Sequence, residues 1–358
     1  MTRGAIALID TNALRHNLSR VRAAAPDSRV IAVVKADAYG HGLKQAAHAL
    51  SAADAFGVAR LDEALALREA GIAHRVLLMD GVTTSDELRV AAQKRVQLVV
   101  HNFEQIDMLE SVRLTTPVQV WLKVDIGMHR LGFSADQFAQ AWQRLNDCSV
   151  VSGTPHIMGH FSHADDRNDS TTTDQLAQFE RLSEPWQAER SVANSAAILS
   201  RPDSHYQWVR PGIMLYGVSP FVDGLADSED LMPVMHLSTQ LIAVQHLRQG
   251  EAVGYGGTWR CPNDMRIGIA AIGYGDGYPR HAESGTPVLV NDQRSQIIGR
   301  VSMDMLAVDL RQMPEASVGD TVTLWGDSLP VEEVAEHAKT IAYELLCGVT
   351  RRVDFKYS

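Results

Sequence analysis

The sequence predicts an α/β fold, a (β/α)8 barrel followed by a mostly β C-terminal domain, on three observations. Strand-like and helix-like segments alternate through roughly the first 220 residues. Eight such units fit into that length, which favours a closed parallel barrel. Beyond a stretch rich in Pro, Gly, Asp and Ser at 220–233, the apolar period drops to near two, which is typical of half-buried strands. A doubly wound open sheet is the alternative, although no Gly-x-Gly-x-x-Gly follows the first strand.

These patterns divide the chain into two domains. We place the barrel at residues 9–225 and the β domain at 226–358. For residues 1–8 we leave pairing with the β domain open. The barrel strands are expected at 30–34, 55–58, 75–79, 96–100, 118–124, 157–161, 191–193 and 207–209, because apolar runs there end at turn residues.

Helices are expected between these strands, with caps at recognisable positions. Thr11 or Asn12 caps the first helix, which runs to Arg22, and Ser134 caps the one that follows the fifth strand. The other helices are expected at 43–52, 61–70, from 85, at 103–112, at 173–182 and from 195. In the β domain, strands are expected at 238–244, 266–272, 288–290, 295–301, 306–310 and 321–324, with one amphipathic helix at 331–346.

Composition excludes several classes of protein. With 33 basic and 43 acidic residues, the net charge of −10 argues against a nucleic-acid binder. The three cysteines are far apart and form no Cys-x-x-Cys pair, so we expect no metal site, no disulfide framework and a reducing, cytoplasmic location. No apolar stretch is long enough to span a membrane or to serve as a secretory signal.

The stretch at 30–42 contains the first candidate for chemistry. Five apolar residues predict a buried strand, and Lys35 follows them directly, before a glycine-punctuated turn and a new helix. Burial lowers the pKa of a lysine, and the free amine can form a Schiff base with an aldehyde. Taken alone, Lys35 is better explained as a strand-end lysine whose charge reaches water.

Other strand ends add polar residues to the same face of the predicted barrel. They deliver Lys123 and Arg130, then His160, and then Arg210. Ser195 begins a helix, and Gly212 and Ile213 follow the last strand, where barrels often bind phosphate. A phosphate pocket beside a lysine amine suggests pyridoxal phosphate.

Nine strings in order also resemble those of the alanine racemases, barrel-type (fold-type III) pyridoxal-phosphate enzymes. They are VVKADAYGHG, WLKVDIGMHRLG, GHFSHAD, ANSAA, VRPGIMLYG, VGYGGTW, IGYGDGYPR, GRVSMDM and AYELLC, and they are spread over nearly the whole chain. The resemblance implies an enzyme, an isomerase that interconverts L-alanine and D-alanine. It would supply D-alanine for peptidoglycan or act in alanine catabolism.

The resemblance also implies the two catalytic bases. Lys35 would bind the cofactor aldehyde and act on one face of the substrate α-carbon, and Tyr255 would act on the other. Because a tyrosine has a pKa near 10, nearby cations would have to stabilise its phenolate. From its pattern alone, Tyr255 is explained as a turn aromatic between glycines.

The remaining site residues follow from the same resemblance. Arg210, hydrogen-bonded to His160, would face the pyridine nitrogen, and Arg130 would bind the substrate carboxylate. Lys123 is a candidate for N-carbamylation, with pairing to Asp125 or another acid as the alternative. The phosphate would be bound by Tyr39, Ser195, Gly212, Ile213 and Tyr343, and the substrate region would include Met303, Asp304 and Tyr274.

The family works as a head-to-tail homodimer, in which Tyr255, Tyr274 and Met303 come from the partner chain. Two positions depart from the family pattern: Ile126 replaces a small hydroxyl residue, and Gly159 replaces Ser or Thr. A broad-specificity or serine racemase is the nearest alternative. A related decarboxylase would need a glycine-rich phosphate loop and a catalytic cysteine, and a non-catalytic pyridoxal-phosphate carrier would lack the β domain.

Overall fold

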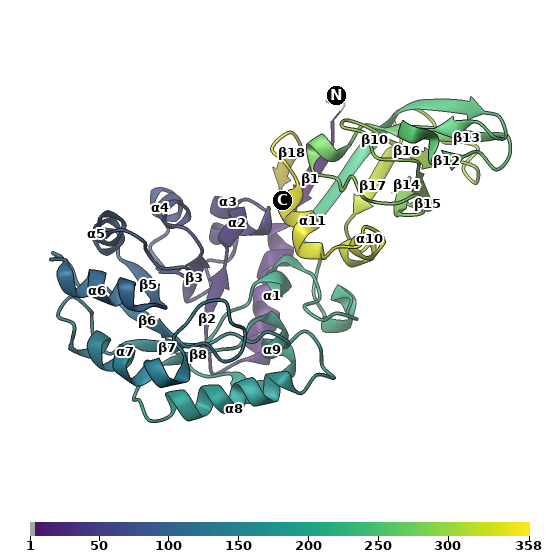
Figure 1. Cartoon of the computed structure of the whole chain (residues 1–358). Helices are drawn as coiled ribbons and strands as arrows, with labels where there is room; N and C mark the ends of the chain where they lie inside the picture. The colour runs from purple at the N-terminus through teal and green to yellow at the C-terminus, as the bar shows by residue number, and fades with distance from the viewer. Residues whose placement is uncertain (1–3) are drawn as a thin grey trace.

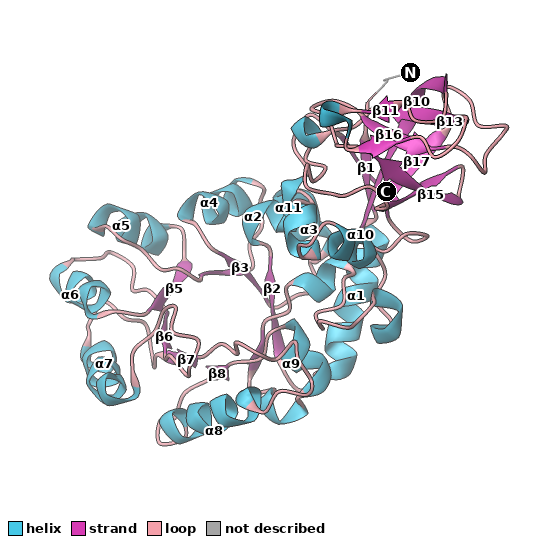
Figure 2. Cartoon of the chain, turned by 45° about the vertical axis from the view of Figure 1, so that its right-hand side comes forward, coloured by secondary structure: helices cyan, strands magenta, loops and turns pink. Residues whose placement is uncertain are grey.

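The computed structural model describes residues 4–358 and confirms a barrel followed by a mostly β domain (Figure 1). Within that range eight parallel strands close a barrel, and Figure 2 shows the helices outside the ring of strands. The ring closes where Arg29 pairs with Trp208 and Val30 with Val209. The strands are β2 (Arg29–Val33), β3 (Ala55–Val58), β4 (Arg75–Leu78), β5 (Val96–Val100), β6 (Val120–Lys123), β7 (His156–Met158), β8 (Arg190–Ser191) and β9 (Trp208–Val209).

Helices cover the outside of the barrel because each presents an apolar face to the strands. In α7 (Ala135–Asp147), for example, the buried residues Phe138, Ala141, Trp142 and Leu145 recur at the helical period. The other helices are α1 (Thr11–Ala24), α2 (Lys35–Tyr39), α3 (Leu43–Ala49), α4 (Leu61–Glu69), α5 (Ser85–Gln93), α6 (Phe103–Ser111), α8 (Thr171–Ser183) and α9 (Ser195–Ser200), with 3-10 turns η1 (Pro202–Ser204), η2 (Ile213–Tyr216) and η3 (Ala226–Glu229).

The two helix caps predicted in the barrel have different outcomes. Ser134 is the N-cap of α7, as expected. The cap of α1 is Asp10, so the prediction of Thr11 or Asn12 was wrong. The Asp10 carboxylate accepts hydrogen bonds from the N–H groups of Asn12 at 2.7 Å and Ala13 at 3.1 Å, which satisfies two of the free donors at the helix start.

The turn after β2 contains glycines with positive φ, and the regular helix α3 begins at Leu43, as predicted. The sequence did not indicate that α2 contains four successive left-handed residues, Ala36 to Tyr39, with φ between 53° and 56°. Gly40 follows at φ 83°. A left-handed run of residues with side chains is costly, so contacts from outside the turn must stabilise it.

The β domain is one strongly curled sheet. The order of its strands is β13-β16-β15-β14-β17-β10-β1-β18, and β10 (Met235–Leu247) also pairs with β13 (Met265–Ala270), which brings the sheet back on itself. The remaining strands are β1 (Ile6–Ile9), β14 (Pro287–Val290), β15 (Gln293–Ile298), β16 (Leu306–Asp309), β17 (Thr321–Trp325) and β18 (Asp354–Tyr357), with a separate hairpin of β11 (Ala252–Val253) and β12 (Trp259–Arg260).

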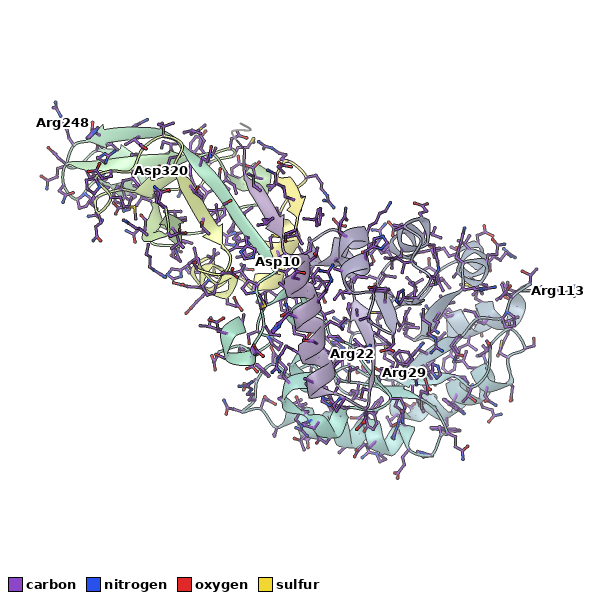
Figure 3. The ribbon with its side chains drawn as sticks, turned by 180° about the vertical axis from the view of Figure 1, so that it is seen from behind. Asp10, Arg22, Arg29, Arg113, Arg248 and Asp320 are labelled. Atoms are coloured by element: carbon purple, nitrogen blue, oxygen red, sulfur yellow. The ribbon has the colours of Figure 1, made fainter. Side chains whose placement is uncertain are left out.

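Strand β1 joins the start of the chain to the β domain. It pairs antiparallel with β10, with Ile6 opposite Ser238, and parallel with β18, with Ile6 opposite Asp354. Residues 1–3 lie outside the described part, and the exact limits of the two domains stay a prediction. The β domain lies beside α1, α2 and α3 (Figure 1), and Figure 3 shows Asp10 where the two parts meet.

The single helix predicted at 331–346 is two helices, so that prediction was wrong. Helix α10 (Val331–His337) ends at the cap Ala338, Lys339 adopts a left-handed φ of 55°, and α11 (Ala342–Gly348) follows. The segment between them contains Thr340 and Ile341, whose branched side chains are weak helix formers. Within residues 4–358 no helix has the length and apolar character needed to cross a bilayer.

Candidate active site

The predicted barrel residues lie at the carboxyl ends of the parallel strands. Lys123 is the last residue of β6, Lys35 and His160 each come two residues after their strands, and Arg210 directly follows β9. Parallel strands deliver such residues to one end of a barrel. We call this end, with Lys35, Lys123, Arg130, His160 and Arg210, the mouth.

Arg210 is fully buried at the mouth among neutral acceptors. Its guanidinium donates to Ser191 Oγ at 2.6 Å and to the carbonyl oxygen of Gly159 at 2.6 Å, and it lies 3.2 Å from His160 Nδ1. Burial lowers the pKa of Arg210 to about 10, and burial followed by the charge of Arg210 lowers that of His160 well below its usual range. Arg210 therefore stays charged and His160 neutral near pH 7.

Lys123 lies close to three other cations. Burial, and then the charges of Arg210 and Arg130, lower its pKa to about 8; Asp80 opposes this shift, and Lys35 adds the least to it. Among residues 4–358 Lys123 forms no ion pair within 4 Å. The predicted alternative partner Asp125 instead shapes the loop before Arg130.

That loop is organised by one carboxylate. Asp125 Oδ1 accepts the N–H groups of Gly127 at 2.9 Å and His129 at 3.0 Å, and Asp125 Oδ2 lies 3.0 Å from His129 Nδ1. Ile126, in the same loop, is buried. These hydrogen bonds fix the loop that leads to Arg130.

A second group of residues forms a cradle of donors around Gly212. Ser195 Oγ accepts the N–H of Gly212 at 2.8 Å, and a Cβ placed on Gly212 would come within 2.6 Å of Tyr39 Oη and 4.0 Å of Ser195 Oγ. Only glycine therefore leaves space beside these two hydroxyls. The Tyr39 ring lies 6.0 Å from that of Tyr343, and Ile213 is buried at the start of η2. These are the residues predicted to bind a phosphate.

The predicted residues of the β domain are grouped separately. Tyr274 begins the turn η5 (Tyr274–Asp276), and its N–H donates to the carbonyl oxygen of Ser302 at 3.0 Å, next to Met303. Asp304 accepts a hydrogen bond from Arg352 at 2.6 Å. The Met303 side chain is 52% exposed, so it is free to contact another surface.

Tyr255 stands apart from the barrel mouth of its own chain. It begins the turn η4 (Tyr255–Gly257) between β11 and β12, and its side chain is 69% exposed. Figure 1 shows β12 in the part of the β domain away from α2, the turn that begins with Lys35. The structure of one chain therefore does not bring Tyr255 and Lys35 together.

Comparison with protein families accounts for both halves of the structure. Residues 9–220 match the family described as "Alanine racemase, N-terminal domain", and residues 234–357 match "Alanine racemase, C-terminal domain". The chain belongs to the alanine racemase family. It is accordingly a racemase, an enzyme of the isomerase class.

Individual alanine racemases resemble the chain over almost its full length. The alanine racemase of Nitrosococcus oceani is 56% identical over 347 residues, 97% of each chain. The crystal structure of the biosynthetic alanine racemase from Pseudomonas aeruginosa matches with a TM-score of 0.97 and 46% identity over 100% of both chains. The alanine racemase of Bartonella henselae, described with covalently bound pyridoxal phosphate, matches with a TM-score of 0.90 and 28% identity over 99% of both.

The departure from the alanine racemase pattern at Gly159 has a packing explanation. A Cβ on Gly159 would come within 2.8 Å of the Phe179 ring and 3.2 Å of Val192, so a Ser or Thr would require both to shift. The Gly159 carbonyl oxygen accepts a hydrogen bond from Arg210 without any side chain. A glycine is therefore compatible with the Arg210 environment.

Sequence reasoning missed two residues that support the site. Tyr216 is buried, stacks at 4.7 Å against both Tyr39 and His41, and donates its hydroxyl to the carbonyl oxygen of Val33 at 2.9 Å. Its place in the VRPGIMLYG string was the available signal. Glu63 contacts the backbone next to Lys35, and nothing in its helical pattern indicated that contact.

Proposed function

We propose that the chain interconverts L-alanine and D-alanine with pyridoxal phosphate. The observation that carries the proposal is the separation of Lys35, on the barrel mouth, from the exposed Tyr255 of the β domain, in a chain this similar to alanine racemases. Racemisation needs a proton removed on one face of the α-carbon and returned on the other, so two bases on separate surfaces suit it.

The mouth suits the proposed cofactor. The hydroxyls of Tyr39 and Ser195 around Gly212 are donors of the kind that bind a phosphate, and Ile213 and Tyr343 complete the proposed cradle. Arg210 is a buried cation that no carboxylate of residues 4–358 pairs with, and His160 supports it. Pyridoxal phosphate, when bound, supplies an aldehyde for the Lys35 amine and a ring that withdraws electrons from the substrate.

Each side chain then has a proposed task. Lys35 Nζ takes or returns the α-proton on one face, and Tyr255 Oη does so on the other. Arg210 would donate to the ring nitrogen of the cofactor, and because it keeps its own protons that nitrogen would stay unprotonated. Arg130 binds the substrate carboxylate. Met303 and Asp304, with Tyr274 at the entrance, are proposed to line the substrate region.

A carbamylated Lys123 would relieve the crowding of cations at the mouth. A pKa of about 8 leaves a useful fraction of its amine neutral, and only a neutral amine adds carbon dioxide. The resulting anion would face Arg130. Mass spectrometry of the native protein, with and without bicarbonate, would reveal the added carboxyl group.

Two chains must cooperate for the two bases to meet, so we propose a head-to-tail homodimer. Mixing Lys35→Ala with Tyr255→Phe chains tests this arrangement. If each site takes Lys35 from one chain and Tyr255 from the other, half of the exchanged dimers contain one intact site, and activity recovers to roughly a quarter of wild type. No recovery after verified subunit exchange would place both bases in one chain.

The decisive test of function is incubation with L-alanine in heavy water. D-alanine with deuterium at the α-carbon is the expected product, and Tyr255→Phe should abolish it while the cofactor stays bound. Tyr206→Phe, which removes a barrel hydroxyl bonded to Glu180, is the control. Exchange without D-alanine would contradict the role of Tyr255. If L-alanine gives neither deuterium exchange nor D-alanine but L-serine is turned over, a serine or broad-specificity racemase is favoured. If no amino acid is turned over, a cofactor carrier is favoured.

The physiological direction is part of the same proposal. The P. aeruginosa structure is described as that of a biosynthetic alanine racemase, which favours supply of D-alanine for peptidoglycan over alanine catabolism. Growth of a deletion strain that requires added D-alanine would support the biosynthetic role.

A further inference from the structure

The turn that begins with Lys35 has an unusual backbone. Ala36, Asp37, Ala38 and Tyr39 are all left-handed, and none of them is glycine. For such residues the left-handed region is less favourable than the right-handed one, because Cβ comes too close to the following carbonyl oxygen. The turn therefore depends on neighbouring groups, and these groups determine the direction in which the lysine leaves the strand.

One carboxylate contacts the backbone directly after Lys35. Glu63 Oε1 accepts the N–H of Ala36 at 2.7 Å, and this N–H belongs to the peptide unit that follows the lysine. The other oxygen, Oε2, accepts the N–H groups of Ala59 at 2.9 Å and Arg60 at 3.1 Å, at the start of α4. A single side chain thus joins the loop between β3 and α4 to the lysine turn.

The next βα unit contains a natural control. Glu87 stands at the same place in α5 as Glu63 does in α4, three residues after the N-cap. Its Oε2 accepts the N–H groups of Thr83 at 2.8 Å and Thr84 at 3.3 Å, both within its own loop. Capping the start of the helix therefore requires only one carboxylate oxygen. The second oxygen of Glu63 is not needed for capping and binds the lysine turn instead.

The opposite side of the turn is held by other elements. Asp37 Oδ1 accepts the N–H of Leu43 at 2.7 Å, and the same carboxylate pairs with Arg351. A Cβ on Gly40 would fall 2.2 Å from the carbonyl oxygen of Leu346, so α11 packs directly on the turn. With that side held, the Glu63 contact determines the orientation of the first peptide plane.

We propose that Glu63 is a positioning residue for Lys35: its carboxylate orients the peptide after the lysine and so directs the lysine amine toward the cofactor aldehyde. This inference rests on the proposed role of Lys35. A displacement of about 1 Å in a reacting group can slow a reaction by about 10²-fold, so a small rotation of this peptide is sufficient to matter.

The test compares Glu63→Gln with Glu87→Gln in the full-length apoprotein. Glutamine must place its NH2 group against one set of N–H donors, so it cannot reproduce both contacts of Glu63. The readouts are the rate at which pyridoxal phosphate becomes covalently attached to Lys35, followed by absorbance and trapped by borohydride, and the free energy of unfolding in urea.

We expect both variants to lose similar stability and only Glu63→Gln to slow covalent attachment, by about tenfold or more. In steady state its kcat should fall by a similar factor, with KM within about threefold. Attachment rates of Glu63→Gln within about twofold of Glu87→Gln would overturn the proposal.

A second variant keeps the test decisive if Glu63→Gln does not fold. Glu63→Asp retains the charge but is one methylene shorter, so it can cap α4 without reaching Ala36, and it should show the same slow attachment. The wild-type protein distinguishes failure of the proposed function from failure of the positioning role. If wild type neither attaches the cofactor nor racemises alanine, the proposed function is wrong. If wild type is active and the Glu63 variants attach the cofactor as fast as wild type does, only the positioning role is wrong.

Discussion

The charged residues at the two ends of the barrel differ in whether they have partners of opposite charge. At the mouth, Lys35, Lys123, Arg130 and Arg210 gather, and among residues 4–358 none of them forms an ion pair with a carboxylate. Burial, followed by the neighbouring cations, lowers the pKa of Lys123 to about 8. A cation whose pKa is lowered by folding makes the folded state less stable at the pH where it must be charged.

At the other end, which we call the base, charges are matched. Arg29 pairs with Glu189, and its guanidinium lies 4.2 Å above the ring of Trp208. Trp208 Nε1 donates to Glu189 Oε2 at 2.7 Å, and His156 Nε2 lies 3.6 Å from the same oxygen. Burial raises the pKa of Glu189, but the hydrogen bonds from Arg29 and Trp208 outweigh it and hold that pKa below its usual value.

The two ends of the barrel are therefore stabilised in different ways. The base contains its own counter-charges and an aromatic filling, with Trp121 and Trp208 in an edge-to-face pair at 5.9 Å, so it holds the barrel together without a ligand. No carboxylate within residues 4–358 forms an ion pair with the cations of the mouth, so the mouth is suited to accept the anions of a phosphate and a carboxylate.

The largest effect is expected at the mouth, from Lys35→Ala. Removing the amine should lower kcat/KM for alanine by on the order of 10³-fold or more, because we propose that both cofactor attachment and proton transfer depend on it. The free energy of unfolding should change by less than about 1 kcal/mol. Lys94→Ala, at the exposed C-cap of α5, is the control for both measurements. Retention of a tenth of the activity would contradict the assignment of Lys35.

The reverse pattern is expected at the base, from Trp208→Ala. This side chain is 2% exposed, and truncating it should cost about 3–5 kcal/mol of unfolding free energy, measured in urea. Catalysis per folded molecule should stay within about twofold of wild type, because the mouth is unchanged. Trp186→Ala, a half-buried tryptophan outside the barrel, should cost less. A large loss of kcat with unchanged stability would refute the division between the two ends.

Acid should destabilise the barrel through its buried histidines, because burial lowers the pKa of His41 and His160 on the mouth side and of His156 at the base. Burial lowers the pKa of His41, behind the lysine turn, to about 4, while an unfolded histidine titrates near 6.5. Unfolding thus takes up a proton between these values, and stability falls by roughly 3 kcal/mol as the pH drops from 6.5 to 4. Glu189, whose pKa is lowered, loses its contribution only below about 4.5.

Urea unfolding between pH 4 and 7.5 measures this dependence. His41→Gln should remove close to one proton from the slope of unfolding free energy against pH in the acid range. His246→Gln, at an exposed position of β10, should leave the slope unchanged. Equal slopes for wild type and His41→Gln would show that His41 is not buried as a neutral residue.

The smallest effect is expected from Ser195→Ala. Losing one hydroxyl of the proposed phosphate cradle should weaken binding of pyridoxal phosphate to the apoprotein about tenfold. Ser200→Ala, at the far end of the same helix with its hydroxyl bonded to the carbonyl oxygen of Ala196 at 2.8 Å, should bind like wild type. Fluorescence titration measures the affinity of each apoprotein for pyridoxal phosphate. Equal affinities for the two variants would show that the phosphate binds elsewhere.

Much of this architecture follows from local patterns. The strands at 55–58 and 96–100 have the predicted limits, because an apolar run bounded by turn residues is a local property. The short strands β8 and β9 extend only two residues each, and β11, β12 and β18 were not predicted, since they lack a sustained apolar period. The break at Lys339 was missed because apolar spacing continues across it.

Local patterns were therefore sufficient to predict the order of strands and helices and the placement of Lys35, Lys123, His160 and Arg210 at strand ends. The contacts that hold these residues depend on the folded structure. The left-handed turn after Lys35 depends on α11 and Arg351, about 300 residues later in the chain, and on Glu63. Such a conformation is unfavourable locally and is stabilised by distant contacts, so no pattern within the turn could have predicted it.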